Sequence, residues 1–481
     1  MNKTLRTIFG VYVFAYAFFF AAVPLNDGDF WWHLKTGEYI VQTHSIPKTD
    51  FFSFTNYGRP WVAHEWLSEA IFYVIYSKLG FNVLIIIFAA LTALAFWIAF
   101  KRSESHPLIA GFATLLGVWS ILPNIGVRPR VFTLLLSSVY LALLSRRNDR
   151  IIWWLVPLMA LWANLHGGFL IGLVLIGLTI VGILLDAWAR NESLKLAWPR
   201  TRTLRWVLTG SFLAGCLNPH GIWIYKFPFD IFFSPVQQRL VEDWLSPNFH
   251  RGETMPLQLL ILLTVAGLAL SPKQVRPGEL LLFLSTLYMT LKSQRHMAIL
   301  ALVSVPLMAD YLQNWITARS NGKIFNPKNL SNLKLSTTSR VFGLIILLPL
   351  IVFVFRLKST VLAVPIQLAL GVPVKAVEYL EKNRIVGNTF TDPNIWGGYL
   401  IWKTPSNPVY IDGRIDMYGD EFAKEYMNLA SGRTGWRETF DRYHVQIVVA
   451  SPTSVIANEM KTVFDWQQVY SDEMAVVFTR R

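Results

Sequence analysis

Apolar runs recur along most of this 481-residue chain and limit its folds more than any other feature. Several runs reach roughly 20 residues, the length at which a helix crosses the hydrocarbon core of a bilayer. The chain is 53% hydrophobic and only 15% charged, which lies outside the usual range of soluble globular proteins. We therefore predict a mainly α-helical protein that crosses the membrane many times.

The runs predict about eleven spans, each with approximate boundaries. They are 7–25, 81–100, 107–125, 131–145, 151–165, 168–187, 206–218, 256–271, 279–292, 296–316 and 341–356. The stretch 65–79 is apolar but short and carries Glu65, Glu69 and Lys78, so we predict an amphipathic helix along the membrane surface. With that helix left out of the count, most loop Lys and Arg fall on one side, which the positive-inside rule makes cytoplasmic.

This topology places the N-terminus in the cytoplasm and a large first outer loop, residues 26–80, on the other side. Residues 1–356 form the predicted transmembrane domain, and residues 357–481 form a C-terminal extracytoplasmic α/β domain. In the C-terminal domain the residue patterns predict helices at 374–383 and 422–430, strands at 407–414 and 445–450, and a hairpin at 467–480. For Arg414 and Asp416, beside a turn at Asp412–Gly413, a structural role is favoured over a place at the active-site mouth.

The net charge of +14 invites a nucleic-acid interpretation, which the distribution of the charge argues against. The basic residues gather in short loops between apolar runs, and no basic helix carries interleaved aromatic residues. We expect membrane lipids as partners and no nucleic acid. Cys216 is the only cysteine, which excludes an intramolecular disulfide and a cysteine-based metal site.

The segment NDGDFWWHLKTGE, residues 26–38, concentrates reactive side chains directly after the first span. A carboxylate such as Asp27 or Asp29 at the bilayer boundary meets a lower dielectric, which increases its basicity. Such a base can take a proton from an acceptor hydroxyl, so we predict Asp29, Asp27 and His33 as catalytic residues. The alternative is that both acids are simply solvated and help to orient the first span.

Further polar residues are predicted to bind the substrate from the outer face. Arg128, Arg130 and Arg295 offer planar guanidinium groups that suit a lipid phosphate leaving group, although arginines at span ends also reach toward lipid headgroups. The same set includes His64, Glu65, His166 and His296. The alternative for His166 is a hydrogen bond that ends a helix.

The run Asp29-Phe30-Trp31-Trp32-His33-Leu34, after a first span and before a long outer loop, resembles the glycosyltransferase C superfamily. Its local likeness is to the acidic motif in the first outer loop of the oligosaccharyltransferase catalytic subunit. The segments WWHLKTGE, PWVAHEWLSE, NLHGG, GGYLIW and IDGR also resemble a large group of bacterial membrane proteins. The general layout is similar to that of protein O-mannosyltransferases and aminoarabinose transferases.

The resemblance implies a polyprenyl-phosphate sugar as donor, a glycan, lipid or protein as acceptor, and reaction on the outer face of a bacterial inner membrane. Asp29 matches the catalytic carboxylate by its spacing to Trp31, and it would orient or deprotonate the acceptor or help to hold a divalent cation. Such a cation, Mg²⁺ or Mn²⁺, would also involve Glu242 and Asp243, which otherwise form a helix end with a turn. The Asp-Glu pair that marks protein mannosyltransferases is absent after the first span, and the WWD motif of oligosaccharyltransferases is absent from the C-terminal domain. Both absences argue against a protein acceptor.

The sequence thus predicts a membrane glycosyltransferase that inverts the transferred sugar. Two alternatives from other classes remain open at this point: a transporter or lipid flippase, and a non-catalytic scaffold of the cell envelope.

Overall fold

The computed structural model describes residues 3–25, 27–146, 149–321, 371–432 and 435–481. Contacts along the chain divide it into two compact units. The helical unit comprises Met1–Val23, Ile85–Ile222 and Glu242–Ala363, and the mixed unit comprises Pro24–Leu84, Trp223–Val241 and Val364–Arg481. Each unit is therefore built from three separate pieces of the sequence.

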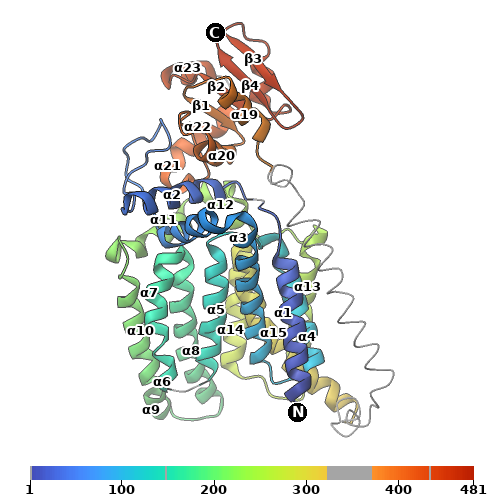
Figure 1. The fold of residues 1–481 in the computed structure, drawn as a ribbon. Coiled ribbons are helices and arrows are strands. Elements are labelled where there is room, and N and C mark those ends of the chain that lie inside the picture. Colours follow the sequence, from blue (N-terminus) through green and yellow to red (C-terminus); the bar gives the residue numbers. More distant parts are fainter. Residues whose placement is uncertain (1–2, 26, 147–148, 322–370, 433–434) are drawn as a thin grey trace. The chain divides into compact units, whose positions relative to one another are not determined.

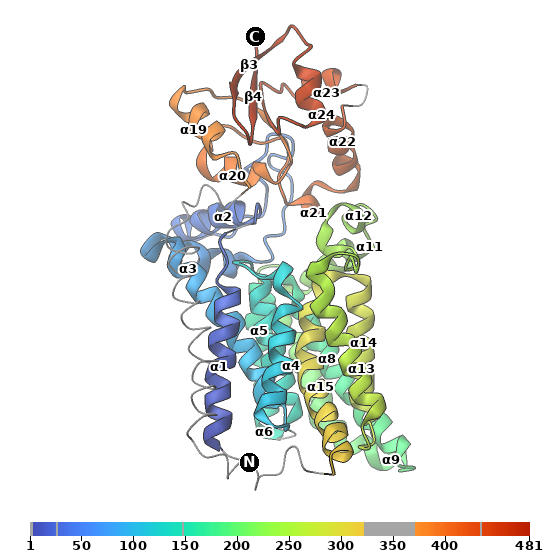
Figure 2. The ribbon, with the colours of Figure 1, turned by 90° about the vertical axis from the view of Figure 1, so that its right-hand side faces the viewer.

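The helical unit contains the long apolar helices, which run side by side in Figures 1 and 2. Its helices are α1 (Lys3–Ala21), α4 (Pro107–Trp119), α5 (Arg130–Ser145), α6 (Asp149–Ile152), α7 (Leu155–Leu165), α8 (Leu170–Ala189), α9 (Leu194–Ala197), α10 (Arg202–Gly215), α13 (Met255–Leu270), α14 (Pro277–Lys292), α15 (Met297–Arg319) and the second half of α3 (Trp66–Arg102). Every predicted span that falls within the described residues coincides with one of these helices. The span predicted at 341–356 lies outside the described residues.

Among the described residues, four stretches are long and apolar enough to cross a membrane: Trp66–Arg102, Gly167–Ala189, Gly252–Leu270 and Gln294–Arg319. Their burial differs in a way that fits a bilayer. In the stretch Gln294–Arg319, which contains α15, 67% of the apolar segment is buried inside the protein. The buried share is 33% in the stretch that contains α8 and 28% in the stretch that contains α13. Leu262 and Val265 of α13 are exposed, and such apolar surface is stable in lipid and costly in water. The protein is an integral membrane protein, and its total of about eleven spans remains a prediction.

Helix α3 is 37 residues long, and Gly80 interrupts it with a φ of 79° and a ψ of 177°. A straight helix of that length would extend about 55 Å, well beyond the ~30 Å of a hydrocarbon core. The kink separates the stretch 65–79 from the predicted span 81–100. The boundary between the two units follows Leu84, so the two halves of α3 belong to different units. The prediction that the first half lies along the membrane surface remains untested.

The mixed unit contains a four-stranded sheet surrounded by helices (Figure 2). Its helices are α2 (Phe30–Thr43), the first half of α3, α11 (Lys226–Phe233), α12 (Gln237–Leu240), α19 (Val374–Lys382), α20 (Trp396–Lys403), α21 (Ile415–Tyr418), α22 (Asp420–Ala430), α23 (Trp436–Arg442) and α24 (Val455–Met460). Its strands are β1 (Thr389–Asp392), β2 (Ile447–Ala450), β3 (Trp466–Ser471) and β4 (Val476–Arg480), in the order β1-β2-β4-β3. Strands β1 and β2 are parallel, and the other two pairs are antiparallel.

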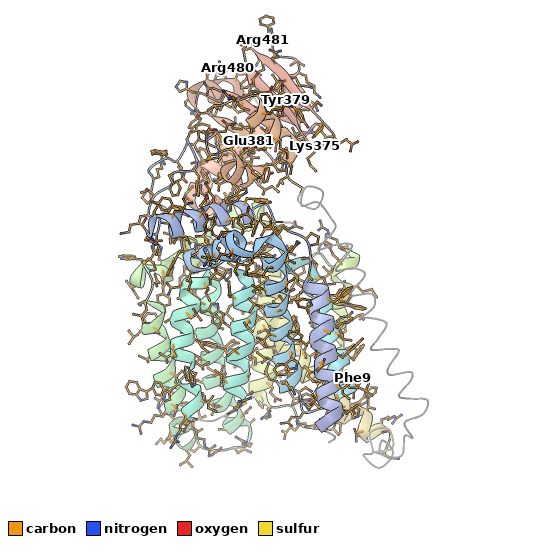
Figure 3. The ribbon with its side chains drawn as sticks, viewed as in Figure 1. Phe9, Lys375, Tyr379, Glu381, Arg480 and Arg481 are labelled. Carbon is orange, nitrogen blue, oxygen red and sulfur yellow. The ribbon has the colours of Figure 1, made fainter. Side chains whose placement is uncertain are left out.

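The predicted C-terminal elements agree with this structure except in one place. Helices α19 and α22, strand β2 and the β3–β4 hairpin lie where the sequence places them. The strand predicted at 407–414 is wrong, because only Val409 forms ladder bridges there. Figure 3 shows Lys375, Tyr379 and Glu381 projecting from α19, and Tyr379 packs against Tyr470 of β3 with ring centroids 5.1 Å apart.

The first outer loop joins the C-terminal sheet through Val409. This residue forms parallel bridges with Thr389 on one side and with Ser53 on the other. The backbone N–H of Phe54 donates to the Val409 carbonyl at 3.2 Å, and the Thr55 hydroxyl donates to the Tyr410 carbonyl at 2.6 Å. The loop therefore folds with the C-terminal residues as one unit, and the boundary predicted between 356 and 357 lies outside the described residues.

A buried arginine lies at the centre of this association. Arg414 is 1% exposed and donates two hydrogen bonds to Asp412, at 2.9 and 2.6 Å. Its Nη2 also lies 2.9 Å from the carboxylate of Asp50, in the first outer loop. The guanidinium lies over the ring of Trp61, with 4.5 Å between its central carbon and the ring centroid. Arg414 thus has the structural role that the sequence favours for it.

Replacement of Arg414 by Leu tests this role. The variant leaves the Asp50 and Asp412 carboxylates buried without their cation, which typically costs about 3–5 kcal/mol. We expect a clear fall in the thermal unfolding temperature of the purified protein and faster proteolysis in the first outer loop. Arg437→Leu, at an exposed position of α23, is the matched control and should change neither measurement.

Candidate active site

Asp29 lies immediately before α2, with its carboxylate in a defined position. The indole N–H of Trp32 donates to Asp29 Oδ1 at 3.2 Å, and the Asp27 carboxylate accepts from the Asp29 backbone N–H at 3.1 Å. On another side the carboxylate meets Gly413: a Cβ at that glycine would lie 1.7 Å from Asp29 Oδ1. Asp27 and Asp29 are both half-buried, so the acidic loop keeps access to solvent.

His33 belongs to a buried chain of acidic and basic groups. Its Nδ1 lies 3.0 Å from Glu69 Oε1, and its Nε2 lies 3.6 Å from Glu65 Oε2. The other oxygen of Glu65 lies 3.4 Å from His64 Nε2. The structure thus brings together three residues that the sequence predicts, His33, His64 and Glu65. In this chain Glu65 lies between the two histidines, and the contacts join α2 to the residues just before α3.

The surroundings of His64 favour its protonated form. Burial lowers the pKa of His64, but the carboxylates of Glu65 and Asp416 outweigh burial and raise the pKa above its ordinary value. Its Nδ1 donates to the Val62 carbonyl at 3.3 Å, which leaves Nε2 facing Glu65. The imidazole also packs on Phe227, with ring centroids 4.1 Å apart. A charged imidazole beside two carboxylates can donate a proton or a hydrogen bond to a polar ligand.

In the helical unit, Arg128, Arg130 and Arg295 converge on Asp243. The nearest distances from the guanidinium nitrogens to Asp243 Oδ2 are 3.5, 2.9 and 3.9 Å. These three arginines and Asp243 are called the arginine cluster below. Burial raises the pKa of Asp243, but Arg130, Arg295 and Arg128 outweigh it and hold the pKa below its ordinary value. Three guanidinium groups thus surround one carboxylate.

Hydrogen bonds fix the backbone around the arginine cluster. Asp243 lies in the short helix η5 (Glu242–Trp244), and Arg295 lies in η7 (Gln294–His296). The Ser293 hydroxyl donates to the Asp243 carbonyl at 2.8 Å, and the Gln294 amide donates to the Glu242 carbonyl at 2.6 Å. The Arg295 guanidinium lies 4.4 Å from the ring centroid of Trp244. The two short helices therefore hold Arg295 against its carboxylate.

His166 and His296 each make the hydrogen bonds of a helix end. His166 Nδ1 accepts from the Gly168 backbone N–H at 2.9 Å and lies 2.7 Å from the Thr133 hydroxyl. Because Nδ1 accepts from the Gly168 N–H, the Thr133 hydroxyl donates to Nδ1, and its oxygen accepts from the indole of Trp162 at 2.8 Å. Nδ1 of His166 therefore acts as an acceptor, and Nε2 carries the proton. His296 Nδ1 lies 3.2 Å from the Met289 carbonyl.

The predicted metal ligands are divided between the two units. Asp29 belongs to the mixed unit, and Glu242 and Asp243 belong to the helical unit. Among the described residues, no group of three or more His, Cys, Asp or Glu side chains is arranged to hold a metal ion. Asp243 is engaged by arginines instead. A divalent cation remains a prediction from the resemblance.

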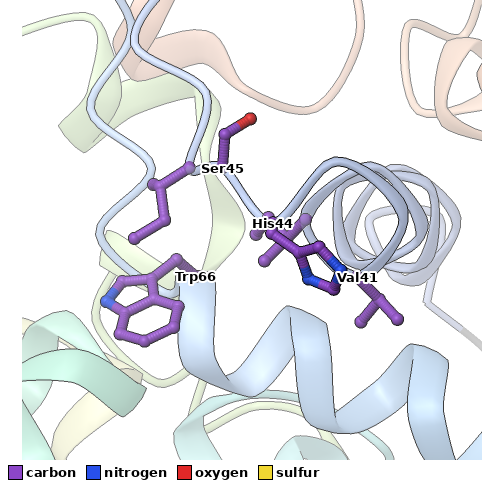
Figure 4. Close-up of a pocket in the computed structure, with 6 residues that line it drawn as sticks. Val41, His44, Ser45 and Trp66 are labelled. Carbon is purple, nitrogen blue, oxygen red and sulfur yellow. The ribbon is translucent and has the colours of Figure 1, made fainter.

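A hollow of about 390 Å³ lies elsewhere in the mixed unit (Figure 4). Its lining comes from the end of α2, the following turn and the start of α3: Ile40, Val41, His44, Ser45, Ile46 and Trp66. The lining is mostly apolar and contains none of the predicted site residues. We do not assign the chemistry to this hollow.

Comparisons with solved structures match the chain over nearly its whole length. The archaeal oligosaccharyltransferase AglB from Archaeoglobus fulgidus, in complex with an inhibitory peptide and a dolichol-phosphate, aligns with a TM-score of 0.59 and 12% identity. The alignment covers 92% of this chain and 69% of that one. The apo form of an oligosaccharyltransferase from the same organism gives a TM-score of 0.58 and 12% identity, over 94% of this chain and 70% of that one. The chain shares its fold with these oligosaccharyltransferases, which belong to the glycosyltransferase C superfamily.

This fold confirms the resemblance that the sequence predicts on the basis of the first outer loop. The likeness is one of structure, because no family model matches the sequence and neither does any curated protein. Within the glycosyltransferase C fold, the predicted site residues form two groups. Asp27, Asp29, His33, His64 and Glu65 lie in the mixed unit, and the arginines lie in the helical unit.

Sequence reasoning missed two features of these groups. Glu69 pairs with His33, but its signal, a carboxylate four residues after Glu65 on one helix face, was used only to define an amphipathic helix. Asp50 pairs with Arg414, which lies more than 350 positions later in the sequence, and no local sequence pattern predicts such a contact. Asp50 also accepts from the backbone N–H groups of Phe52 and Ser53, as an Asx turn does.

A pH series with His64→Gln tests the charge on His64. Because its pKa is raised in the folded protein, the charge stabilises the fold fully below the unfolded pKa of about 6.5, and this is lost as the pH rises through the folded value. We expect the variant to unfold at a lower temperature than the wild type at about pH 6, with a smaller difference at about pH 9. His250→Gln, at an exposed position, is the control; equal differences for H64Q at both pH values would contradict the charge assignment.

Proposed function

We propose that the protein is a membrane glycosyltransferase that moves a sugar from a polyprenyl-phosphate-linked donor to the hydroxyl of an acceptor. The convergence of Arg128, Arg130 and Arg295 within a glycosyltransferase C fold carries this proposal. A lipid phosphate that leaves the sugar gains negative charge, and preorganised cations stabilise that charge. The similar archaeal enzyme was solved with a dolichol-phosphate, which is a lipid of the same chemical class.

In the proposed reaction the acceptor oxygen attacks the anomeric carbon of the donor sugar. The bond from that carbon to the phosphate oxygen breaks, and the phosphate leaves with the electron pair. Asp29 takes the proton of the acceptor hydroxyl, which makes the oxygen a better nucleophile as the new bond forms. A single displacement of this kind inverts the anomeric centre. Asp27 and His33 support Asp29, and His64 and Glu65 bind hydroxyl groups of the substrate.

The arginine cluster has the chemistry of a phosphate site. The guanidinium of Arg130 and that of Arg128 each present paired N–H donors that fit two phosphate oxygens at once. Asp243 keeps the arginines close together before the phosphate arrives, since like charges would otherwise separate them. His166 and His296 lie at helix ends and offer further donors to the phosphate or the sugar. We place the reaction on the extracytoplasmic face of a bacterial inner membrane, with the N-terminus in the cytoplasm.

Two observations bear on the class of acceptor. The similar archaeal protein was solved with an inhibitory peptide, whereas this chain has no WWD motif. We therefore propose a glycan or lipid hydroxyl as acceptor, with a protein as the alternative. A radiolabelled polyprenyl-phosphate sugar, incubated with the purified protein and each acceptor class in turn, identifies the acceptor by the product that carries the label. Transport of the donor between leaflets without bond cleavage would favour a flippase.

Asp29→Asn tests the base. The amide keeps the shape and the hydrogen bond from Trp32 but accepts no proton, and loss of a general base costs about 10²–10⁴-fold in rate. We expect sugar transfer to fall by that factor while the unfolding temperature stays unchanged. Asp230→Asn, at an exposed position of α11, is the control. Full activity of D29N would remove Asp29 from the role of base.

Arg130→Gln tests the phosphate site in a separate way. Loss of one donor to a developing anion typically costs about 10²–10³-fold in kcat. We expect the variant to lose activity in that range and to bind polyprenyl phosphate more weakly. Arg251→Gln is the matched control, because Arg251 is exposed and pairs with Glu242 and Glu253 outside the arginine cluster. Equal donor binding and turnover in R130Q would exclude the cluster as the phosphate site.

A further inference from the structure

The carboxylate of Asp29 is bounded by the backbone of the C-terminal part of the chain. A Cβ at Gly413 would lie 1.7 Å from Asp29 Oδ1, 2.9 Å from its Cγ and 3.4 Å from Trp32 Nε1. Any side chain at position 413 would therefore occupy the place where the carboxylate and its indole donor meet. The absence of a side chain at Gly413 is what allows Asp29 to take this position.

Two more close approaches fix the acidic loop to the same segment. A Cβ at Gly28 would lie 2.8 Å from the Cβ of Ile395, and a Cβ at Gly398 would lie 2.6 Å from the Gly28 carbonyl oxygen. These contacts lie at and just before the start of α20. The backbone of the loop around Gly28 therefore rests directly on residues 395–398, with Gly413 closing the side where Asp29 lies.

The position of Gly413 is itself rigid, because both of its neighbours are buried and charged. Asp412 accepts two hydrogen bonds from Arg414 and one from the Tyr418 hydroxyl at 2.8 Å. Arg414 is bound to Asp50 of the first outer loop. A short segment anchored at both ends in this way moves little, so it can hold a neighbouring carboxylate in one rotamer.

We propose that Gly413 is a positioning residue for Asp29 and that the C-terminal segment 395–414 forms one wall of the catalytic site. The inference rests on the proposed function, in which Asp29 takes the acceptor proton. It assigns to the C-terminal domain a direct part in catalysis: its backbone sets the direction in which the base points. In the sequence pattern IDGR, Asp412 and Arg414 are the fixed residues, and Gly413 between them has no side chain.

Gly413→Ala is a selective test of this role. Within the described residues Gly413 is not among the glycines with a positive φ, so its backbone accepts alanine. The atom that the new methyl group meets most closely is the end of the Asp29 side chain, which can rotate away while the backbone stays. We expect kcat for sugar transfer to fall about 100-fold, the scale of a base misplaced by ~1 Å, with the KM for the donor unchanged.

Gly252→Ala is the matched control, since a Cβ there meets no atom within 4 Å. It should leave kcat, KM and the unfolding temperature as in the wild type. A G413A protein with wild-type kcat would overturn the inference. An equal loss of kcat in the control would also overturn it. So would general unfolding of G413A that removal of the Asp29 carboxylate does not correct.

A double-mutant cycle separates positioning from a merely structural effect. If Gly413 acts through Asp29, G413A should have no further effect on the residual transfer rate of D29N. Additive losses in the double variant would contradict the role. Should G413A fail to fold, the Asp29→Ala/Gly413→Ala protein decides, because removal of the carboxylate relieves the clash and should restore folding. Failure of this double variant to fold would also contradict the inference.

The outcomes distinguish this inference from the function on which it rests. If the wild-type protein transfers sugar from no polyprenyl-phosphate donor, the result contradicts the proposed function and the role of Asp29 as base. An active wild type with an unimpaired G413A variant removes only the role of Gly413.

Discussion

The ion pairs of Arg414 hold together the parts of the mixed unit. One guanidinium satisfies carboxylates from Asp50 and Asp412, which lie far apart in the sequence. Buried charges of this kind persist only when each has a partner, so neither part reaches its final arrangement without the other. The aromatic rings of Trp61 and Phe52 shield the cation from water. The β-bridge between Ser53 and Val409 depends on the same register.

The acidic loop around Asp29 is supported by residues from the C-terminal part of the chain. Loops that carry functional residues are often held on a rigid scaffold, and the scaffold of this loop is the C-terminal sheet with its helices. Val236, from the segment 223–241, packs into the core of that sheet, and Ser234 donates to Asp420 at 2.5 Å. The chain continues from this segment to Asp243, in the arginine cluster.

Much of the fold could be predicted from the sequence, because apolar length and residue periodicity are local properties. The spans before residue 320, the helices α19 and α22 and the β3–β4 hairpin all follow from such patterns. The bridge between Val409 and Ser53 could not be predicted, since the two residues lie more than 350 positions apart in the sequence. For the candidate site, residue types identified Asp29 and the three arginines. Their real partners, Gly413 and Asp243, depend on tertiary contacts that no spacing encodes.

The mixed unit is assembled from three pieces, and the last of them is also the last to be synthesised. When the first outer loop leaves the ribosome, the residues that will pair with Asp50 and cover Trp32 do not yet exist. The aromatic side chains of the loop therefore stay uncovered until the C-terminal residues have been synthesised. During biogenesis there is thus a long interval in which the lipid surface or a chaperone can cover those aromatic rings.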